Sequence, residues 1–526
     1  MQAMNGAESL VRTLVNGGVD TCFTNPGTSE MQFVAAADRV PEMRCVLCLF
    51  EGVASGAADG YARMTDAPAA TLLHLGVGLA NALSNFHNAF RANVPIVNIV
   101  GDHATWHRRH DAPLYSHIEA YARPVSGWVR SVETAAEMPE AAHAAIAASL
   151  GPPGRIATLI TPADCTWDES EEPITDPVLF RGFPSVDERI IQDAAAALRS
   201  GQPTALLMSG FALRAKGLEL ASRIANKAGA RVICDTFNPR LERGAGRATI
   251  ERLPYFAEQA IQSLSGLKHL IVVGTKAPVG FFAYPGLPSE LAPPDCKVHV
   301  LARVEENTID ALKRLAAAIG ADRVEPTLQE LRRPPLPVGE LNPETVAKSL
   351  AALMPEHSII SDEGVSAGLP LLPFTAGAPP HDWLFGTGGS IGQGLPVGTG
   401  AAVACPDRRV ICLQADGSGM YTVQALWTQA RESLNVTNVI YKNNAYRILA
   451  IEYERVGGGK PGPKATELFA LDRPEIDWLR LAGSMGVSAR SASTAEEFSA
   501  ALKWSLGEPG PTLIEAAIVQ NDKSAA

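Results

Sequence analysis

One stretch of the sequence, residues 410–446, constrains the fold of the chain more than any other. It begins with an apolar, strand-like run, VICLQ, which ends at the sequence ADGS around Asp416, and a helical pattern follows. A second apolar run, VTNVIY, ends at an amide pair whose second member is Asn444. Strand, helix and strand in this order predict a βαβ unit, whose parallel strands end at the same edge of a sheet. We therefore expect Asp416 and Asn444 to lie close together at that edge.

These polar residues are suited to a metal ion and a phosphate. Asp416 and Asn444 supply hard oxygen ligands of the kind that Mg²⁺ takes when it also holds phosphate groups. Gly417 and Ser418 begin the helical stretch, so their backbone N–H groups can hold the phosphate itself. The alternative is an Asp at a helix N-cap and an unrelated Asn pair on the surface. Because polar residues stand at both strand ends, the pattern favours the metal site.

The same stretch resembles the signature of thiamine-diphosphate-dependent enzymes, which runs from G-D-G-S to a pair of asparagines. In this sequence Ala415 replaces the first glycine, at a position before the metal-binding Asp. The resemblance implies that Mg²⁺ is bound by Asp416, by Asn444 and by the backbone carbonyl of Tyr446.

A second segment with this resemblance begins at Glu51. The carboxylate follows the apolar run CVLCLF and begins a helix of small residues. On its own, a Glu at this place is a helix N-terminal residue that interacts favourably with the helix dipole. The sequence FEGVASGAADGYAR is also similar to the segment of thiamine-diphosphate enzymes in which a Glu contacts N1′ of the cofactor pyrimidine. That contact would favour the imino tautomer and so help to remove the proton from the thiazolium C2 carbon.

A glycine-rich turn at residues 386–392 supplies the third match. It follows the strand-like run WLF and precedes a helix that begins with GQGLP. By resemblance, Ile391 is the bulky residue beneath the bent cofactor, and the carbonyl of Gly389 accepts from the 4′-amino group. A dinucleotide-binding loop is the competing interpretation, but Ile391 stands where its third glycine is required. Ser366, on the preceding turn, is a further candidate contact of the diphosphate.

Two more residues match substrate-facing positions of benzoylformate decarboxylases and acetolactate-synthase-like enzymes. Thr28 lies in the turn NPGT, and His74 ends the strand-like run ATLLH. His74 can transfer a proton to or from the reacting carbon, although a histidine at a strand end can also be purely structural. A loop farther along the chain contains four histidines, either acid–base groups or solvated side chains: His103, His107, His110 and His117.

Other positions differ from both kinds of enzyme. The second active-site histidine of benzoylformate decarboxylases is missing, and Phe281 or Phe282 lies nearest, in the segment GFFAYPG. The Phe-Gln pair of acetolactate synthases reads Pro113-Leu114. These differences favour decarboxylation or aldehyde ligation over the synthesis of branched-chain acetolactates.

Length and composition predict several well-packed domains. The chain has 526 residues, of which 46% are apolar and only 19% charged, so large buried cores are expected. The resemblance implies three doubly wound α/β domains with parallel sheets. These are a pyrimidine-binding domain at residues 1–165, a central Rossmann-like domain at 186–330 and a diphosphate-binding domain at 343–526.

Charge and hydropathy exclude several other classes of protein. The net charge is −11 without a block of Lys and Arg, which argues against nucleic acid and anionic membranes as partners. The sequence shows neither a signal peptide nor an apolar run that could span a membrane, so we expect a cytoplasmic protein. Cys45 and Cys48 lie in an apolar run and are expected to point inward as buried thiols. No FAD is expected, because the chain is short for the flavin-carrying members of the family.

Together these features predict a thiamine-diphosphate- and Mg²⁺-dependent lyase or carboligase that acts on 2-oxo acids. The resemblance implies a homodimer or homotetramer in which Glu51 of one subunit faces the metal of the other. Within the family, cleavage of a 2-hydroxyacyl or 2-hydroxyketone substrate is the alternative. A cofactor-binding paralogue without turnover and a nucleotide-dependent dehydrogenase are the other classes; the retained Glu51 argues against the paralogue.

Overall fold

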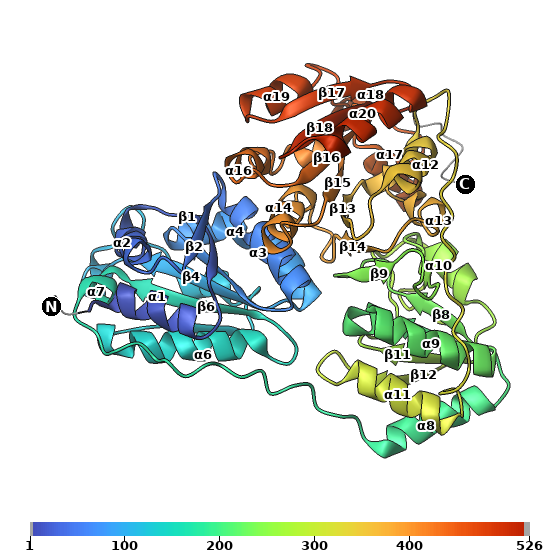
Figure 1. Ribbon diagram of the computed structural model, residues 1–526, viewed down its shortest axis with the longest axis horizontal. Coiled ribbons are helices and arrows are strands. Elements are labelled where there is room, and N and C mark those ends of the chain that lie inside the picture. The colour runs from blue at the N-terminus through green and yellow to red at the C-terminus, as the bar shows by residue number, and fades with distance from the viewer. Residues whose placement is uncertain (1–3, 520–526) are drawn as a thin grey trace.

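The computed structural model describes residues 4–519, and its strands form three parallel or mainly parallel sheets covered by helices (Figure 1). Buried apolar strands that alternate with helices form such sheets because both faces must be covered. The predicted fold class, α/β with three parallel sheets, is confirmed. Figure 1 shows the N-terminal unit in blue and teal, the central unit in green and yellow, and the C-terminal unit in orange and red.

The first sheet has six parallel strands in the order β2-β1-β3-β4-β6-β5. Its strands are β1 (Thr21–Asn25), β2 (Arg44–Leu47), β3 (Ala69–Leu73), β4 (Ile96–Asp102), β5 (Trp128–Ser131) and β6 (Ile156–Pro162). Its helices are α1 (Gly6–Asn16), α2 (Met31–Arg39), α3 (Glu51–Thr65), α4 (Leu75–Ala92), α5 (Ile118–Ala122), α6 (Met138–Leu150) and α7 (Ala163–Trp167). Because Asn25 of β1 pairs with Leu73 of β3, the turn NPGT and His74 leave the sheet side by side.

One expectation about this sheet is wrong. Cys48 is buried, but Cys45 is exposed. The reason is the position of β2, which is an edge strand and pairs only with β1. The apolar run around these cysteines predicted a strand covered on both faces, and a sequence pattern does not reveal which strand ends the sheet.

The central sheet has five strands in the order β10-β8-β7-β11-β12. They are β7 (Thr204–Met208), β8 (Arg231–Cys234), β10 (Glu251–Arg252), β11 (His269–Val273) and β12 (Lys297–Ala302). The helices of this unit are α8 (Glu188–Arg199), α9 (Ala215–Ala228), α10 (Ala257–Leu264) and α11 (Thr308–Ala318). A long segment without regular structure connects α7 to α8 and is visible in Figure 1 below the body of the molecule.

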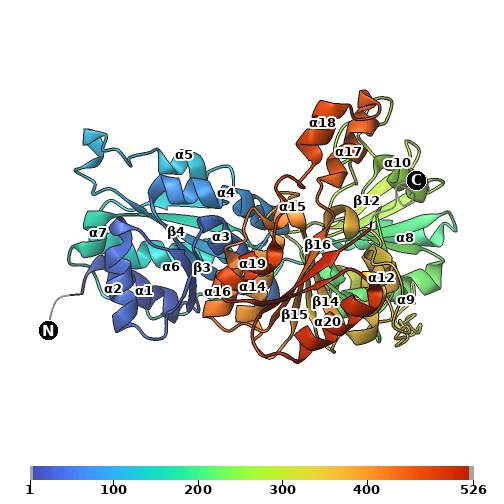
Figure 2. The same cartoon turned by 90° about the horizontal axis from the view of Figure 1, so that it is seen from above.

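The third sheet has seven strands in the order β17-β18-β16-β15-β13-β14-β9. They are β9 (Leu241–Arg243), β13 (Ile359–Glu363), β14 (His381–Phe385), β15 (Val410–Ala415), β16 (Val436–Lys442), β17 (Ser488–Ala492) and β18 (Thr512–Ala517). Its helices are α12 (Pro343–Leu353), α13 (Leu371–Phe374), α14 (Gly394–Ala404), α15 (Asp416–Gly419), α16 (Ala425–Arg431), α17 (Arg447–Tyr453), α18 (Pro463–Phe469), α19 (Trp478–Ser484) and α20 (Ala495–Gly507). Figure 2 shows α17 and α18 projecting from this unit.

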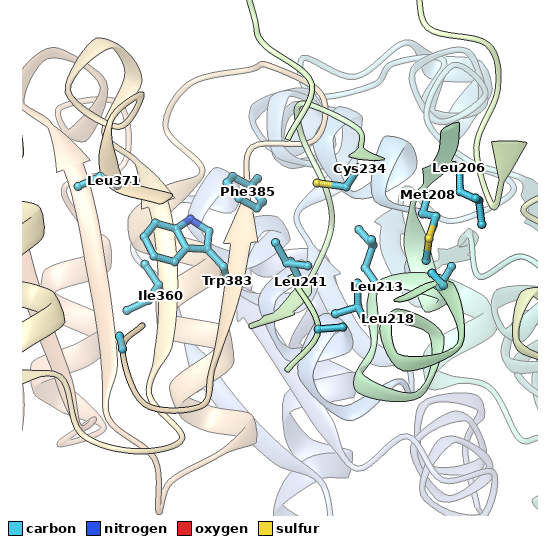
Figure 3. Packing of buried hydrophobic residues seen from close by; sticks show 14 of the residues in the cluster. Leu206, Met208, Leu213, Leu218, Cys234, Leu241, Ile360, Leu371, Trp383 and Phe385 are labelled. Atoms are coloured by element: carbon cyan, nitrogen blue, oxygen red, sulfur yellow. The ribbon is translucent and has the colours of Figure 1, made fainter. Parts of the chain in front are cut away.

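The central unit is joined to this third sheet by β9. This strand comes from the central part of the chain and pairs antiparallel with β14. Its Leu241 belongs to one apolar core that contains Met208 of the central sheet as well as Trp383 and Phe385 of the third (Figure 3). Because this core is continuous, the central unit is held against the C-terminal sheet.

The N-terminal unit meets the C-terminal unit through α3 and α14, which lie side by side near the centre of Figure 1. A Cβ atom on Gly60 would lie 2.0 Å from the carbonyl oxygen of Val397, and one on Gly400 would lie 1.8 Å from that of Ala57. Only glycine permits so close an approach of two helix backbones. The run of small residues after Glu51 thus builds the contact between the two units.

Among residues 4–519, the structure contains no helix that combines the length and the apolar character needed to cross a membrane.

Candidate active site

Asp416 is held at the edge of the third sheet by backbone N–H groups. The register of β15 and β16 pairs Ala415 with Tyr441, so both strands end at this edge. The Asp416 carboxylate accepts hydrogen bonds from the N–H of Asn443 at 3.1 Å, of Asn444 at 2.7 Å and of Gly417 at 2.8 Å. The βαβ pattern correctly placed these residues together. Burial raises the pKa of Asp416, and the N–H donors lower it in part.

Asn444 adopts a left-handed backbone conformation beside this carboxylate. Its φ of 54° lies in the left-handed region, which Asn tolerates better than most residues. Its side-chain nitrogen donates to Glu475 Oε1 at 3.3 Å and leaves the side-chain oxygen to act as a ligand. Asn444 is therefore suited to this position by its backbone conformation as well as by its side chain.

The residues around Asp416 fit a magnesium ion. A carboxylate, the Asn444 amide oxygen and the Tyr446 carbonyl, the ligands that the resemblance implies, would make an all-oxygen set of the type that Mg²⁺ prefers. The Tyr446 ring fills the space beside Gly417, where an added Cβ would lie 2.3 Å from its Cε1 atom. Across the described residues no group of three or more His, Cys, Asp or Glu side chains could hold a metal, so a Mg²⁺ here would rely on amide and carbonyl oxygens beside the single carboxylate.

The helix expected after Asp416 is interrupted. It stops after four residues as α15, and α16 begins only at Ala425. The N–H of Gly417 already donates to Asp416, and the Ser418 hydroxyl accepts from Gln414 and donates to the carbonyl of Ala415. Both residues lie in the predicted place, but the bond to Asp416 occupies the Gly417 N–H that the sequence assigned to a phosphate.

The glycine-rich turn before α14 is held by residues of α4. The carbonyl of Ser390 accepts from Asn88 Nδ2 at 2.8 Å, and its N–H donates to Asn88 Oδ1 at 3.1 Å. His87 Nε2 lies 3.2 Å from the carbonyl of Gly388. Gly389 has a φ of 74°, a conformation that requires glycine. Ile391 is half-buried within this well-defined turn.

A buried carboxylate holds the other end of the turn. Glu363 accepts from the N–H of Gly392 and from the N–H of Gly394, each at 2.6 Å. Burial raises the pKa of Glu363 to about 7, although the N–H donors oppose the rise. Ser366 lies three residues later in a short 3₁₀ turn, which packs against α17 and β15.

The central unit contributes an aromatic ring to this region. A Cβ on Gly389 would lie 2.5 Å from Cζ of Phe281, so this ring packs directly against the turn. Phe281 also contacts Tyr255 and Phe282, with ring centroids 5.3 Å and 5.1 Å apart. Phe281 is 43% exposed and Phe282 55% exposed. The phenylalanine segment is therefore next to Gly389 of the glycine-rich turn.

Glu51 and His74 come together at the N-terminal unit. Glu51 is buried and accepts a hydrogen bond from Asn81 Nδ2 at 3.0 Å. A Cβ on Gly78 would lie 3.3 Å from Glu51 Oε1 and 3.5 Å from His74 Cβ, so both residues border the same small space. The His74 ring packs on Gly27, directly before the exposed Thr28. Thr28, Glu51 and His74 are called the N-terminal half-site below. Gly389, Ile391, Asp416 and Asn444 are called the C-terminal half-site.

Three of the four loop histidines lie next to one another. Successive rings of His103, His107 and His110 have centroids 5.6 Å apart, and His117 is exposed. A cavity of about 370 Å³ lies elsewhere, lined by Arg240, Arg247, Arg408 and several carboxylates, and by none of the candidate residues. Its Asp382 forms ion pairs with Arg240 and Arg408.

Sequence reasoning missed the residues that orient the half-sites. Glu363 and Asn88 are buried polar residues, and a polar residue at a position that the apolar pattern predicts to be buried is the signal that could have marked them. Asn81 is exposed, so no such signal marks it. Their hydrogen-bond partners lie far away in the sequence, so the sequence could indicate that such a residue is important but not which residue it contacts.

Family models match both ends of the chain. The N-terminal binding domain of thiamine pyrophosphate enzymes matches residues 4–120, and their C-terminal binding domain matches residues 371–516. Thiamine pyrophosphate is another name for thiamine diphosphate. The C-terminal match contains Asp416, Asn444 and the glycine-rich turn, and the N-terminal match contains Glu51 and His74.

Similar proteins extend the match over nearly the whole length. A Mycobacterium tuberculosis protein provisionally described as an acetolactate synthase large subunit is 53% identical over 98% of this chain and 99% of its own. The benzoylformate decarboxylase of Pseudomonas aeruginosa is 29% identical over 95% of this chain and 96% of its own. A thiamine diphosphate-dependent 4-hydroxybenzoylformate decarboxylase of Rhodococcus jostii has the same fold, with a TM-score of 0.85 and 24% identity over 99% of this chain and all of its own.

Proposed function

The chain belongs to the thiamine pyrophosphate enzymes, and we propose that it is a Mg²⁺-dependent decarboxylase and carboligase of 2-oxo acids. It is an enzyme similar to acetolactate synthases and to benzoylformate decarboxylases. The observation that carries the proposal is the pair of half-sites. One end of the chain supplies a buried carboxylate beside a histidine, and the other supplies a buried carboxylate that backbone N–H groups of the amide pair hold in place.

Each half-site has a separate task in this proposal. When bound, thiamine diphosphate supplies a carbon nucleophile that adds to the 2-oxo acid and accepts the electrons left by CO₂. Asp416 and Asn444 would hold Mg²⁺ and with it the diphosphate. Glu51 would hold a proton at the pyrimidine nitrogen, and Asn81 orients its carboxylate. His74 would move a proton to or from the substrate.

We propose that the complete site forms between two copies of the chain, with the N-terminal half-site of one facing the C-terminal half-site of the other. Thr28 is exposed in the single chain, and so are Tyr421 and Phe281 beside the glycine-rich turn. A second subunit would cover these residues and exclude water from the reacting carbon.

The ring of Phe281 favours ligation over aldehyde release. After CO₂ leaves, the substrate carbon either takes up a proton and departs as an aldehyde, or adds to a second carbonyl compound. A phenyl ring next to Gly389 cannot give a proton, and it makes that side of the site apolar. We therefore propose substrates with an apolar side chain and a high share of hydroxyketone product.

Reconstitution tests this function directly. The purified protein, stripped with a chelator, should regain CO₂ release from 2-oxo acids only when both thiamine diphosphate and Mg²⁺ are added. A panel of pyruvate, phenylpyruvate, benzoylformate and a branched-chain 2-oxo acid shows which substrate side chain the enzyme prefers. Each acid is tested with and without an aldehyde acceptor, so that decarboxylation and ligation are measured separately. Phe281→His should raise the share of free aldehyde, with Phe180→His, a distant exposed position, as control. No cofactor-dependent turnover of any substrate would refute the proposal.

A further inference from the structure

Two free cysteines, Cys22 and Cys45, face each other across the strands β1 and β2. The parallel register pairs these two residues directly, so their side chains project from the same face of the sheet. Neighbouring strands lie about 4.8 Å apart, and a disulfide joins residues whose Cα atoms are about 4.4–6.8 Å apart. A bond between the two sulfur atoms is therefore compatible with the strands as they stand.

The two thiols differ in exposure and in acidity. Cys45 is exposed, because β2 is an edge strand, whereas Cys22 is completely buried. A hydrogen bond between the thiols lowers the pKa of Cys45, although desolvation by its neighbours and the charge of Asp38 oppose this. The same hydrogen bond, together with burial, raises the pKa of Cys22 well above its usual range. Because the thiolate is the nucleophile, Cys45 is the reactive and accessible sulfur, and Cys22 lies directly behind it.

Cys48, the nearest cysteine in the sequence, is not the partner of Cys45. It packs in the apolar core that contains Phe23 and Val46, whereas Cys22 belongs to the core on the other face of the sheet. Its Sγ atom faces the carbonyl of Val46 at 3.8 Å, and burial raises its pKa to about 12. The register of the strands, and not the C-x-x-C spacing, therefore selects the pair.

We propose that Cys22 and Cys45 form a reversible, peroxide-sensitive thiol–disulfide pair, in which Cys45 reacts first and Cys22 resolves the product. The Cys45 thiolate attacks one oxygen of hydrogen peroxide, the O–O bond breaks, and hydroxide leaves with a sulfenic acid formed on the sulfur. The Cys22 sulfur then attacks the Cys45 sulfur. An S–S bond forms, the S–O bond breaks, and the thiol proton leaves with the hydroxyl group as water. Both sulfurs are oxidised and the peroxide is reduced to water; a small dithiol reverses the bond by exchange.

Peptide mapping of the full-length protein tests this pair. The reduced protein is treated with hydrogen peroxide, its remaining thiols are blocked with iodoacetamide, and it is digested with trypsin. Cys22 lies in the tryptic peptide 13–39, whereas Cys45 and Cys48 share the peptide 45–63. The Cys48→Ala variant is therefore mapped beside wild type, so that the linked sulfur is identified without ambiguity. Both proteins should yield the two peptides joined by a disulfide, and dithiothreitol should separate them.

Two further measurements separate the roles of the thiols. In Cys22→Ala the resolving thiol is gone, so dimedone should trap Cys45 as the sulfenic acid, and excess peroxide should convert it to the sulfinic acid. In wild type, Cys45 should be oxidised about 10-fold faster than the half-buried Cys296 and Cys405, because their surroundings raise the pKa of both thiols. A Cys45–Cys48 bond in wild type, oxidation of Cys45 to the sulfinic acid without linkage to Cys22, or equal rates at the three thiols would overturn the proposal. Each result is read by mass without cofactor or substrate, so it is independent of the proposed function.

Discussion

The two half-sites are held in different ways. In the N-terminal half-site, side chains orient the reactive groups: Asn81 donates to Glu51, and Glu30 faces His74. In the C-terminal half-site, the backbone orients these groups. Asp416 accepts from the N–H groups of Asn443 and Gly417, and Glu363 accepts from the N–H of Gly392 in the glycine-rich turn.

The difference follows from the task of each half. Proton transfer needs a group whose electrostatics can be tuned, and side-chain partners provide that tuning. A metal and a diphosphate need a rigid arrangement of oxygen ligands and N–H donors, which strand ends and tight turns provide. Substitutions should therefore change chemistry alone in the first half-site, and chemistry together with folding stability in the second.

Glu51→Gln tests the first part of this comparison and should have the largest effect on turnover. The amide can still accept from Asn81, so the unit should fold normally and bind cofactor with nearly wild-type affinity. Loss of the ionisable carboxylate should slow exchange of the C2 proton by about 10³-fold. Proton exchange is followed by NMR after dilution into deuterated buffer, and affinity by calorimetry. Exchange at the wild-type rate would remove Glu51 from the mechanism.

Asp416→Asn tests the second part and should affect two measurements at once. An amide nitrogen would face one or two of the N–H groups that the carboxylate now accepts, which costs about 1–3 kcal/mol of folding stability. Metal-dependent cofactor binding should also be lost. Urea unfolding and calorimetry with Mg²⁺ measure the two effects, and Asp472→Asn at an exposed position is the control. If stability were unchanged, the backbone would not hold this half-site as described.

The sequence predicted the two half-sites to different extents, because one is held by the backbone at strand ends and the other by side-chain partners. Asp416 and Asn444 follow strands, and strand ends are readable from apolar runs, so their proximity could be inferred. Glu51 was recognised by resemblance, because the pattern of small residues after it is distinctive. The roles of Asn81 and Glu30 were not predicted, because a single sequence does not show that Asn81 contacts Glu51 or that Glu30 contacts His74.

The fold shows a similar limit. The strand-like runs VICLQ and VTNVIY coincide with β15 and β16 to within one residue at each end, because each is a short apolar run that ends at polar residues. Short strands such as β9 and β10 were missed, since two or three residues carry no periodic signal. The contribution of β9 to the C-terminal sheet is a tertiary contact that only the packed core explains.

Two glycine substitutions, Gly417→Ala and Gly78→Ala, test how tightly each half-site is packed. A methyl group on Gly417 would lie 2.3 Å from the Tyr446 ring, whereas one on Gly78 would lie no closer than 3.3 Å to Glu51. Gly417→Ala should therefore destabilise the fold by about 1–3 kcal/mol through overpacking, and Gly78→Ala by less than about 1 kcal/mol. Urea unfolding of both variants measures the difference. Equal values would mean that the C-terminal half-site is no more rigid than the other.

The smallest effect concerns the charge of Glu363. Because burial raises its pKa to about 7, the folded protein binds one more proton than the unfolded chain between the ordinary pKa of Glu and pH 7. Stability from this group is therefore present at low pH and is lost as pH rises toward 7, by about 1 kcal/mol between pH 6 and pH 7. Glu363→Gln should flatten the pH dependence of the unfolding free energy in that range, whereas the exposed control Glu356→Gln should not. Parallel curves for wild type and Glu363→Gln would show that the N–H groups of Gly392 and Gly394 keep the carboxylate charged throughout, and that the backbone offsets the whole cost of its burial.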